Sequence, residues 1–468
     1  MRILLVQPAN APATIGGEDI FIYEPLALEY VAAGVADSHD VRILDLRMGD
    51  DLVDELEDFR PDVVGITAYT VHVNVARRLF DDVKRWNPGV VTVIGGHHAT
   101  LLPDDFLSPS IDAVVIGDGV SAFREIVESI ERGRPLDGIP GVAVPGNGGL
   151  TTPGRRAPEE LDGVPFPARA LTARYRSRYY SEWMKPLATI RTSKGCPYRC
   201  SFCALWKLTG GRYLRRDPEK VVEELKTIAE PFVFFADDES LIDTGRMQRL
   251  ADLIRAAGIR KRYFLYGRAD TIARSPALLA SWREIGLERV FIGFEFTRDE
   301  DLRGIRKGST VSDNEAAARI LNDLGIEIYG SFIVRPDFTR EDFAAFAPYC
   351  EKLGLRFASF AVLTPLPGTD LMAQVENQLI TRNYDFFDFI HTLLPTALPL
   401  DEFFEQLYAL YARAIPLRRQ LPMLRKYRVL DFLTGLRRGR RVLGQMRGAY
   451  RDYQASAPVR PAVHASEA

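Results

Sequence analysis

Three cysteines lie close together in the middle of this sequence. Residues 196–203 read CPYRCSFC, which places Cys196, Cys200 and Cys203 on one short segment directly after a Lys-Gly pair. Thiolates at this spacing form a donor set for a soft metal centre. A structural zinc ion ordinarily takes four protein ligands, and the one remaining cysteine, Cys350, is far away on a predicted helix. A [4Fe–4S] cluster held by three cysteines keeps one iron open to a further ligand.

Carboxylates stand together after one of the predicted strands. Phe232–Phe235 is followed by Ala-Asp-Asp-Glu, so that Asp237, Asp238 and a glutamate are crowded at the end of the strand. Crowded carboxylates repel one another unless a cation or an ammonium group lies beside them, and this favours a bound ligand. The alternative is a solvated loop or a helix N-cap.

Arg268 and Glu295 follow the next two predicted strands. The planar fork of a guanidinium suits a ligand carboxylate. A structural salt bridge between these two residues is the competing interpretation.

The elements that must position these residues form an alternating pattern from about residue 186 onward. Six apolar runs alternate with longer amphipathic segments, which predicts six βα-type units and an incomplete parallel barrel. Chemistry in such a barrel gathers at the carboxyl ends of the strands, where the cysteines and the charged residues stand. The predicted strands are Leu187–Thr192, Phe232–Phe235, Tyr263–Tyr266, Val290–Phe294, Ile326–Val334 and Ala358–Leu363.

The first part of the chain shows a second set of βα units. Its five strand candidates are almost wholly apolar, as expected for a doubly wound parallel sheet that is covered on both faces. Ligands of such sheets bind at the carboxyl ends of the strands, where this chain has glycine-rich loops but no GxGxxG fingerprint. The predicted strands are Arg2–Val6, Val41–Leu46, Asp62–Ile66, Val90–Ile94 and Ala113–Ile116.

The composition is typical of a globular protein and gives no sign of a nucleic-acid-binding or disulfide-rich one. The 468 residues include 46% hydrophobic residues, and 60 Lys and Arg balance 63 Asp and Glu, so that overall charge gives no reason to expect nucleic acid as a partner. Four cysteines in the whole chain, and no leader or membrane span, favour the reducing cytoplasm. The expected parts are an α/β domain at 1–135, a Pro/Gly-rich linker at 136–185, the partial barrel at 186–378, a helical region at 379–453 and a disordered tail at 454–468.

The CxxxCxxC spacing after the first strand of a partial barrel resembles that of the radical S-adenosylmethionine (SAM) enzymes. The resemblance implies that the three cysteines hold a catalytic [4Fe–4S] cluster, whose open iron binds SAM and cleaves it to a 5′-deoxyadenosyl radical. It also implies that Phe202 lies near the adenine, that Asp237 or Asp238 contacts the amino group of SAM, and that Glu295 contacts its ribose. Arg268 is the candidate partner of the SAM carboxylate.

An α/β domain ahead of such a barrel resembles the cobalamin-binding subclass of these enzymes. The resemblance implies a corrin on the strand ends of the first domain, although the DxHxxG signature that supplies a cobalt ligand elsewhere is absent. No axial ligand is therefore assigned. The candidate cobalamin-contacting residues lie in three strand-end loops and are Tyr69, Thr70, Gly95, Gly96, His98 and Gly117.

Three segments, from Leu363 to Leu371, from Phe386 to His391 and from Leu394 to Leu400, resemble the hopanoid C-3 methylase group. This implies methylation of an unactivated carbon of an apolar substrate, with methylcobalamin as methyl donor. A cyclase or rearrangement enzyme with the same cofactors, or a cobalamin-binding sensor without catalysis, are the alternatives.

The chemistry implies an electron donor such as flavodoxin or ferredoxin. Residues 411–452 hold twelve Lys or Arg against two Asp, and they also carry Leu424, Val429, Phe432 and Leu436. A basic amphipathic helix of this kind suits peripheral contact with a membrane surface, and a solvated helical face packed on the barrel is the alternative.

Overall fold

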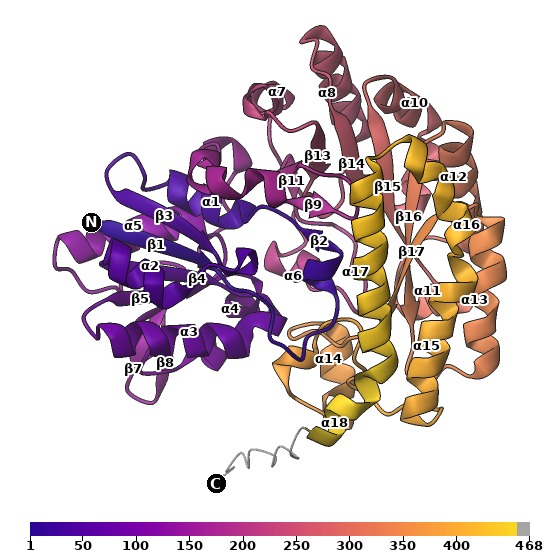
Figure 1. The fold of residues 1–468 in the computed structure, drawn as a ribbon. Coiled ribbons are helices and arrows are strands. Elements are labelled where there is room, and N and C mark those ends of the chain that lie inside the picture. Colours follow the sequence, from indigo (N-terminus) through magenta and orange to yellow (C-terminus); the bar gives the residue numbers. More distant parts are fainter. Residues whose placement is uncertain (456–468) are drawn as a thin grey trace.

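The computed structural model describes residues 1–455, and its N-terminal part is built on one parallel sheet. The parallel strands lie in the order β3-β1-β4-β5-β6, and helices cover both faces of the sheet (Figure 1), which confirms the doubly wound domain. The strands are β1 (Arg2–Gln7), β3 (Asp40–Asp45), β4 (Val63–Thr67), β5 (Val91–Gly95) and β6 (Ala113–Val115). The helices are α1 (Leu26–Ala33) and α5 (Gly119–Glu131) on one face, and α2 (Leu52–Phe59) and α3 (Val73–Trp86) on the other.

The segment expected to be a linker begins as part of this sheet. Strand β7 (Val142–Gly146) pairs antiparallel with β6 and continues through a tight turn into β8 (Gly149–Thr151). Val142 and Ala143 are fully buried by this pairing. The Asn147-Gly148 pair between two apolar segments is typical of a β-hairpin turn. The linker prediction relies on the prolines and glycines and does not use this signal.

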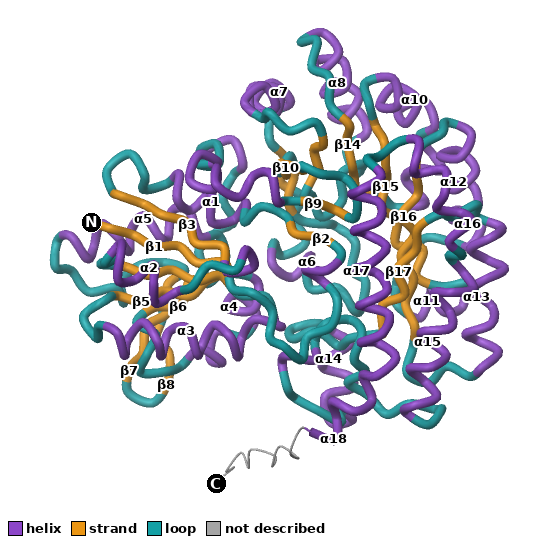
Figure 2. Tube along the Cα trace, in the orientation of Figure 1, coloured by secondary structure: helices purple, strands orange, loops and turns teal. Residues whose placement is uncertain are grey.

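The second part is a six-stranded parallel sheet whose strands follow one another in chain order. Figure 2 shows these strands flanked by helices, and the chain order leaves β10 and β17 as the two edges of an incomplete barrel, as the sequence predicts. The strands are β10 (Leu187–Ile190), β13 (Phe232–Phe235), β14 (Arg262–Tyr266), β15 (Leu287–Glu295), β16 (Glu327–Val334) and β17 (Phe357–Val362). The main helices between them are α7 (Pro218–Thr227), α8 (Thr244–Ala256), α10 (Pro276–Glu284), α12 (Val311–Asp323) and α13 (Arg340–Lys352).

A short helix, α14 (Asp370–Val375), follows the last strand, and within the region expected to be helical, 379–453, α-helices begin only at residue 400. Residues 379–399, expected to be helical, form an irregular segment with one turn at Tyr384–Phe386. The last two prolines of this segment, Pro395 and Pro399, are incompatible with a helix interior. The helices are α15 (Leu400–Ala414), α16 (Leu417–Gln420), α17 (Val429–Gly448) and α18 (Asp452–Ala455). Within residues 1–455, no helix combines the length and the apolar content that a bilayer span needs. The expected tail lies outside the described residues apart from its first two positions.

Helix α17 runs across the open side of the barrel (Figure 1). Phe432 lies 5.6 Å from the ring of Trp183, and Gly435 is close enough that a Cβ there would lie 3.3 Å from the same indole. The indole also packs against Phe357 at the start of β17. Since Trp183 stands just ahead of β10, these contacts close the gap between the two edge strands.

A buried histidine ties α18 to the irregular segment. The Nδ1 of His391 lies 2.8 Å from Asp388 Oδ2, and its Nε2 lies 3.1 Å from Asp452 Oδ2. Burial lowers the pKa of His391, but the two carboxylates outweigh burial and raise this pKa above its ordinary value of 6.5. The imidazolium therefore stabilises the fold below pH 6.5, and this contribution is lost as pH rises through the raised pKa.

We expect the Tm of the protein to fall between pH 6 and pH 9 through this group, with a loss of about 2 kcal/mol because both hydrogen bonds involve charged partners. Thermal unfolding of His391→Gln measures it. The variant is expected to be less stable at pH 6 and to show a smaller decrease toward pH 9, whereas His39→Gln serves as a control outside this cluster. An unchanged pH profile in His391→Gln would contradict the assignment.

Candidate active site

The cysteine loop is held in place by its backbone. Gly195 opens the loop at φ +87°, where a Cβ would collide with the carbonyl of Arg212, so that only glycine fits. Its amide donates to Asp238 Oδ2 at 2.6 Å. Further along, the Ser201 amide donates to the carbonyl of Ile305 at 3.0 Å, and the indole of Trp206 donates to the carbonyl of Cys200 at 3.2 Å. The loop is thus fixed from both sides.

The three thiols suit a cluster better than a single ion. Cys200 is buried, and burial raises the pKa of Cys196 to about 11 and that of Cys203 to about 12. Thiols in such an environment become thiolates when a metal centre supplies positive charge. Within residues 1–455, no three His, Cys, Asp or Glu side chains converge as a single ion requires. A [4Fe–4S] cluster binds each cysteine to a different iron, so that its ligands stand farther apart than those of a single ion, and three neighbouring thiols on one loop are the donor set that it takes.

The carboxylates after β13 face in different directions. Asp237 is buried and accepts hydrogen bonds from the amides of Thr192 (2.7 Å) and Ser193 (2.8 Å) and from the hydroxyl of Thr192. Both of its oxygens accept hydrogen bonds, so Asp237 supports the chain after β10, and its contact with the SAM amino group stays a prediction. Asp238 is half-buried and holds the amide of Gly195 at the start of the cysteine loop.

The third carboxylate, Glu239, is the one whose unpartnered oxygen is buried. It is buried, its Oε1 accepts from the amide of Arg268 at 3.2 Å, and its Oε2 has no hydrogen-bond partner. Burial raises the pKa of Glu239 to about 7, and the carboxylate acts electrostatically on Cys196. A buried, unpartnered carboxylate oxygen beside the cysteine loop suits an ammonium group of a ligand.

Arg268 and Glu295 do not pair with each other. The guanidinium of Arg268 donates to Asp270 at 3.0 Å and to the carbonyl of Lys307 at 2.6 Å, and it stacks 3.6 Å from the ring centre of Tyr198. Arg268 therefore braces the cysteine loop through Tyr198, with two of its nitrogens already engaged. Phe202 of that loop packs against the barrel core.

Glu295 occupies a strained position at the end of β15. Its backbone has φ +62°, and the register between β15 and β16 shifts there. Its carboxylate accepts from Lys307 Nζ at 2.6 Å. A glutamate in the left-handed region at a strand end directs its side chain away from the regular pleat, as residues at functional sites often do.

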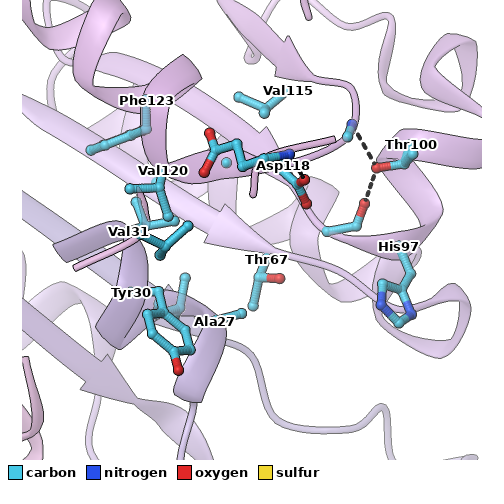
Figure 3. Close-up of a pocket in the computed structure, with 18 of the residues that line it drawn as sticks. Ala27, Tyr30, Val31, Thr67, His97, Thr100, Val115, Asp118, Val120 and Phe123 are labelled. Carbon is cyan, nitrogen blue, oxygen red and sulfur yellow. Dashed lines mark hydrogen bonds between the residues drawn. The ribbon is translucent and has the colours of Figure 1, made fainter. Parts of the chain in front are cut away.

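A pocket of about 210 Å³ opens at the carboxyl ends of β4, β5 and β6 (Figure 3). The hydroxyl of Thr100 ties two of its loops together, since it donates to the carbonyl of Gly96 at 2.9 Å and accepts from the amide of Gly117 at 3.0 Å. Gly96 has φ +102°, and a Cβ there would lie 2.8 Å from the backbone of Ala68. A Cβ at Gly117 would meet nothing, so that this glycine leaves the pocket open.

The barrel contributes to the same pocket. Arg191 and Lys194, from the chain that follows β10, line it together with residues of the first domain, and Lys194 forms an ion pair with Asp118. The pocket therefore lies where the two parts of the chain meet, on the side that carries the cysteine loop.

Comparison with known proteins accounts for both parts of the site. The B12 binding domain family matches residues 14–127, and the Radical SAM superfamily matches residues 190–349. The hopanoid C-3 methylase of Methylococcus capsulatus is 33% identical over 87% of this chain and 79% of its own. The chain belongs to the cobalamin-dependent radical SAM methyltransferase family.

Other relatives of this methyltransferase differ in their reactions. The anaerobic magnesium-protoporphyrin IX monomethyl ester cyclase of Rubrivivax gelatinosus is 27% identical over 88% of this chain and 77% of its own. The solved structure of OxsB, a cobalamin-dependent SAM radical enzyme with aqua-cobalamin and SAM bound, superposes with a TM-score of 0.70 at 16% identity, over 86% of this chain and 65% of OxsB. That likeness confirms the fold.

The cofactors of the methyltransferase are cobalamin, SAM and a [4Fe–4S] cluster. When bound, they supply hydrogen abstraction and a methyl group. The residues present fit all three, because the cysteine loop offers three thiols, Glu239 keeps a free carboxylate oxygen beside them, and the glycine-lined pocket leaves room at the strand ends. We assign the cluster to the cysteines, the SAM amino group to Glu239 and the corrin to the pocket as proposals.

Of the two adjacent histidines after β5, the structure turns His98 away from the methyltransferase's pocket. His98 is fully buried, with Nδ1 3.2 Å from the hydroxyl of Thr70 and Nε2 2.8 Å from Asp105. Both nitrogens of His98 and the hydroxyl of Thr70 thus have partners inside the first domain, and the assignment of these two residues to cobalamin stays a prediction. His97 lines the pocket, and its ring meets the half-exposed ring of Tyr69 edge-on at 4.8 Å.

His97 is the residue at this edge that the sequence analysis missed. Among residues 1–455 it makes no hydrogen bond, and burial lowers its pKa to about 4, so that it presents a neutral imidazole. We expect His97→Ala to weaken cobalamin binding about tenfold, because one packed ring contact is lost. Cobalamin retained after gel filtration, followed by its visible absorbance, measures this. His39→Ala, at the opposite edge of the sheet, is the matched control, and equal retention in both variants would refute the placement.

Proposed function

We propose that this enzyme methylates an unactivated carbon of an apolar, ring-containing substrate of the hopanoid type. The observation that supports the proposal is a run of aromatic side chains across the barrel interior. Ring centres lie 4.7 Å apart for Phe234 and Phe264, 5.0 Å for Phe234 and Tyr266, 4.9 Å for Tyr266 and Phe291, and 5.3 Å for Phe291 and Tyr329. These rings come from four successive strands, so that they form a continuous apolar floor.

Small side chains stand between this floor and the carboxyl ends of the strands. Ser331 and Ser359 occupy the next inward positions on β16 and β17, two residues beyond Tyr329 and Phe357. Both serines are half-buried, and their hydroxyls lie 3.2 Å apart. Both serines point into the barrel and still have accessible surface, so side chains do not fill the interior at this level. The unfilled space leaves room for a substrate close to the cysteine loop.

In this proposal four parts of the site have separate roles. The cysteine loop holds the cluster, Glu239 orients SAM and the aromatic floor orients the substrate. The pocket lined by His97, with Tyr69 packed against that histidine, holds cobalamin on the facing domain. Exclusion of water by the aromatic interior protects a reactive intermediate. The reaction needs an electron donor such as flavodoxin or ferredoxin, and we place the enzyme in the reducing cytoplasm.

Anaerobic expression in a hopanoid-producing host that lacks this gene tests the proposal. We expect hopanoids heavier by one methylene unit, and none with the Cys200→Ala variant. Unchanged lipids from a protein that carries cluster and cobalamin would refute the hopanoid substrate.

Cyclisation is the second candidate, because the magnesium-protoporphyrin cyclase aligns with 88% of this chain. The mass of the product separates the two reactions, since methylation adds a methylene unit and ring closure removes hydrogen.

A further inference from the structure

Exposed aliphatic side chains cluster in the C-terminal helical region, from α16 to the first turns of α17. Of thirteen large hydrophobic side chains that are exposed among the described residues, six fall within residues 417–433. Single exposed hydrophobic residues are ordinary on a protein surface, but a group of this size marks a contact site. The six are Leu417, Leu421, Leu424, Val429, Leu430 and Leu433, and we call them the leucine patch.

The first turns of α17 present this patch on the outer face of the helix. Leu430 is 68% exposed and Leu433 is 46% exposed, and Arg437 and Arg440 follow at spacings that keep all four on one face. The opposite face packs inward, where Phe432 and Val442 are buried. The outer face therefore changes along the helix from apolar to basic.

The charge around the patch is almost wholly positive. Residues 416–451 contain eleven Lys or Arg and one acidic residue, Asp431. Some of these cations already have partners, such as Arg419 with Glu351 and Lys426 with Glu327. Five exposed arginines form no ion pair among the described residues, and they are Arg418, Arg425, Arg428, Arg437 and Arg440.

We propose that the leucine patch and these five arginines dock the enzyme on an anionic lipid bilayer. Aliphatic side chains that enter the headgroup boundary, ringed by cations that meet lipid phosphates, are the features of an interfacial helix. Nucleic acid would use the arginines but has no use for six aliphatic side chains. A second copy of this chain would bring the same five cations against one another.

Docking at this place brings the amino end of the barrel to the bilayer. Met423, Tyr427 and Phe432 belong to the same segment as the leucine patch, and they are buried against interior aromatic residues such as Phe232 and Phe264. One segment thus faces lipid on its outer side and the barrel interior on its inner side. Lipid binding can be measured without turnover. The test of the docking proposal is therefore independent of the test of the proposed methylation.

Co-sedimentation of the full-length holoenzyme with vesicles tests the proposal. We expect binding to vesicles of phosphatidylcholine with phosphatidylglycerol, weaker binding at high salt, and little binding to phosphatidylcholine alone. The triple variant Leu421→Ser, Leu430→Ser, Leu433→Ser is expected to bind at least tenfold more weakly. The double variant Arg437→Gln, Arg440→Gln is expected to lose about fivefold for each arginine.

The matched control replaces exposed aliphatic residues outside the patch, with Val53→Ser and Leu107→Ser, and should bind as the wild type does. Far-UV circular dichroism and cluster content confirm that each variant is folded. Equal vesicle binding by the triple variant and the wild type overturns the proposal. The proposal is also overturned if the wild-type protein stays in solution with anionic vesicles. In that case a dimer that the leucine changes dissociate would make the patch an interface between two copies, and binding of duplex DNA through the arginines would make it a nucleic-acid site.

Discussion

Replacing Cys200 by alanine is expected to abolish SAM cleavage, with a rate at least a thousandfold lower. We assign the [4Fe–4S] cluster to three thiols, and the one remaining cysteine, Cys350, is buried on α13 in the barrel core. Two thiolates leave two irons without a protein ligand, so that the cluster is lost or converted to another form. Cys200 is also the most buried of the three, at 7% exposure, so that solvent has little access to the position of its sulfur.

Iron content, cluster absorbance and 5′-deoxyadenosine formation measure the effect in anaerobically purified protein. Cys350→Ala is the matched control, because it removes a buried thiol of the same barrel and should leave cleavage near the wild-type rate. Residual cleavage in Cys200→Ala, with a full complement of iron, would show that the cluster is bound elsewhere.

Most of the fold follows from the sequence because its strands are buried on both faces. A run such as Val233–Phe235 in β13, or Leu4–Val6 in β1, is apolar throughout and has no place other than the centre of a covered parallel sheet. The amphipathic segments between such runs then have to be the covering helices. Chain order fixes the rest, since consecutive βα units lie side by side.

The parts of the fold that could not be predicted from the sequence depend on contacts between residues far apart in the chain. Strand β7 is identified only by its pairing with β6, and its prolines and glycines resemble a linker until the hairpin is seen. The irregular segment before α15 is held by His391 and Asp452, which stand 61 positions apart. Periodicity within a short window contains no information about either contact.

Sequence reasoning finds the loops of the site but not which neighbour faces the ligand. In the run from Asp237 to Glu239 only the last carboxylate has a buried oxygen without a hydrogen-bond partner, and of His97 and His98 only the first lines the pocket. A change of one position turns a side chain in another direction, and the hydrogen-bond partners that fix this direction, such as Asp105 for His98, come from other segments. The cysteines escape this uncertainty because three of them have to share one centre.

Glu239→Gln is expected to raise the Kd for SAM about thirtyfold while the cluster content stays unchanged. Glutamine keeps the size of the side chain and the acceptor for the amide of Arg268, but it removes the negative charge that we assign to the ammonium group of SAM. A hydrogen bond to a charged group contributes about 1.5–3 kcal/mol, and thirtyfold lies inside that range. The Kd is measured by equilibrium dialysis. Glu230→Gln, which changes a buried glutamate just ahead of the amino end of β13, is the matched control.

The pH dependence of SAM binding gives a second test of the same residue. Burial raises the pKa of Glu239 from its ordinary value to about 7, so that without SAM its contribution to stability is present at low pH and is lost as pH rises through about 7. SAM binds the ionised carboxylate, and its affinity should therefore be higher at pH 8 than at pH 6. The rise in Tm on adding SAM should follow the same order in the wild type and should no longer increase from pH 6 to pH 8 in Glu239→Gln. A variant that keeps the wild-type pH dependence would show that another group receives the amino group, because glutamine at this position cannot titrate.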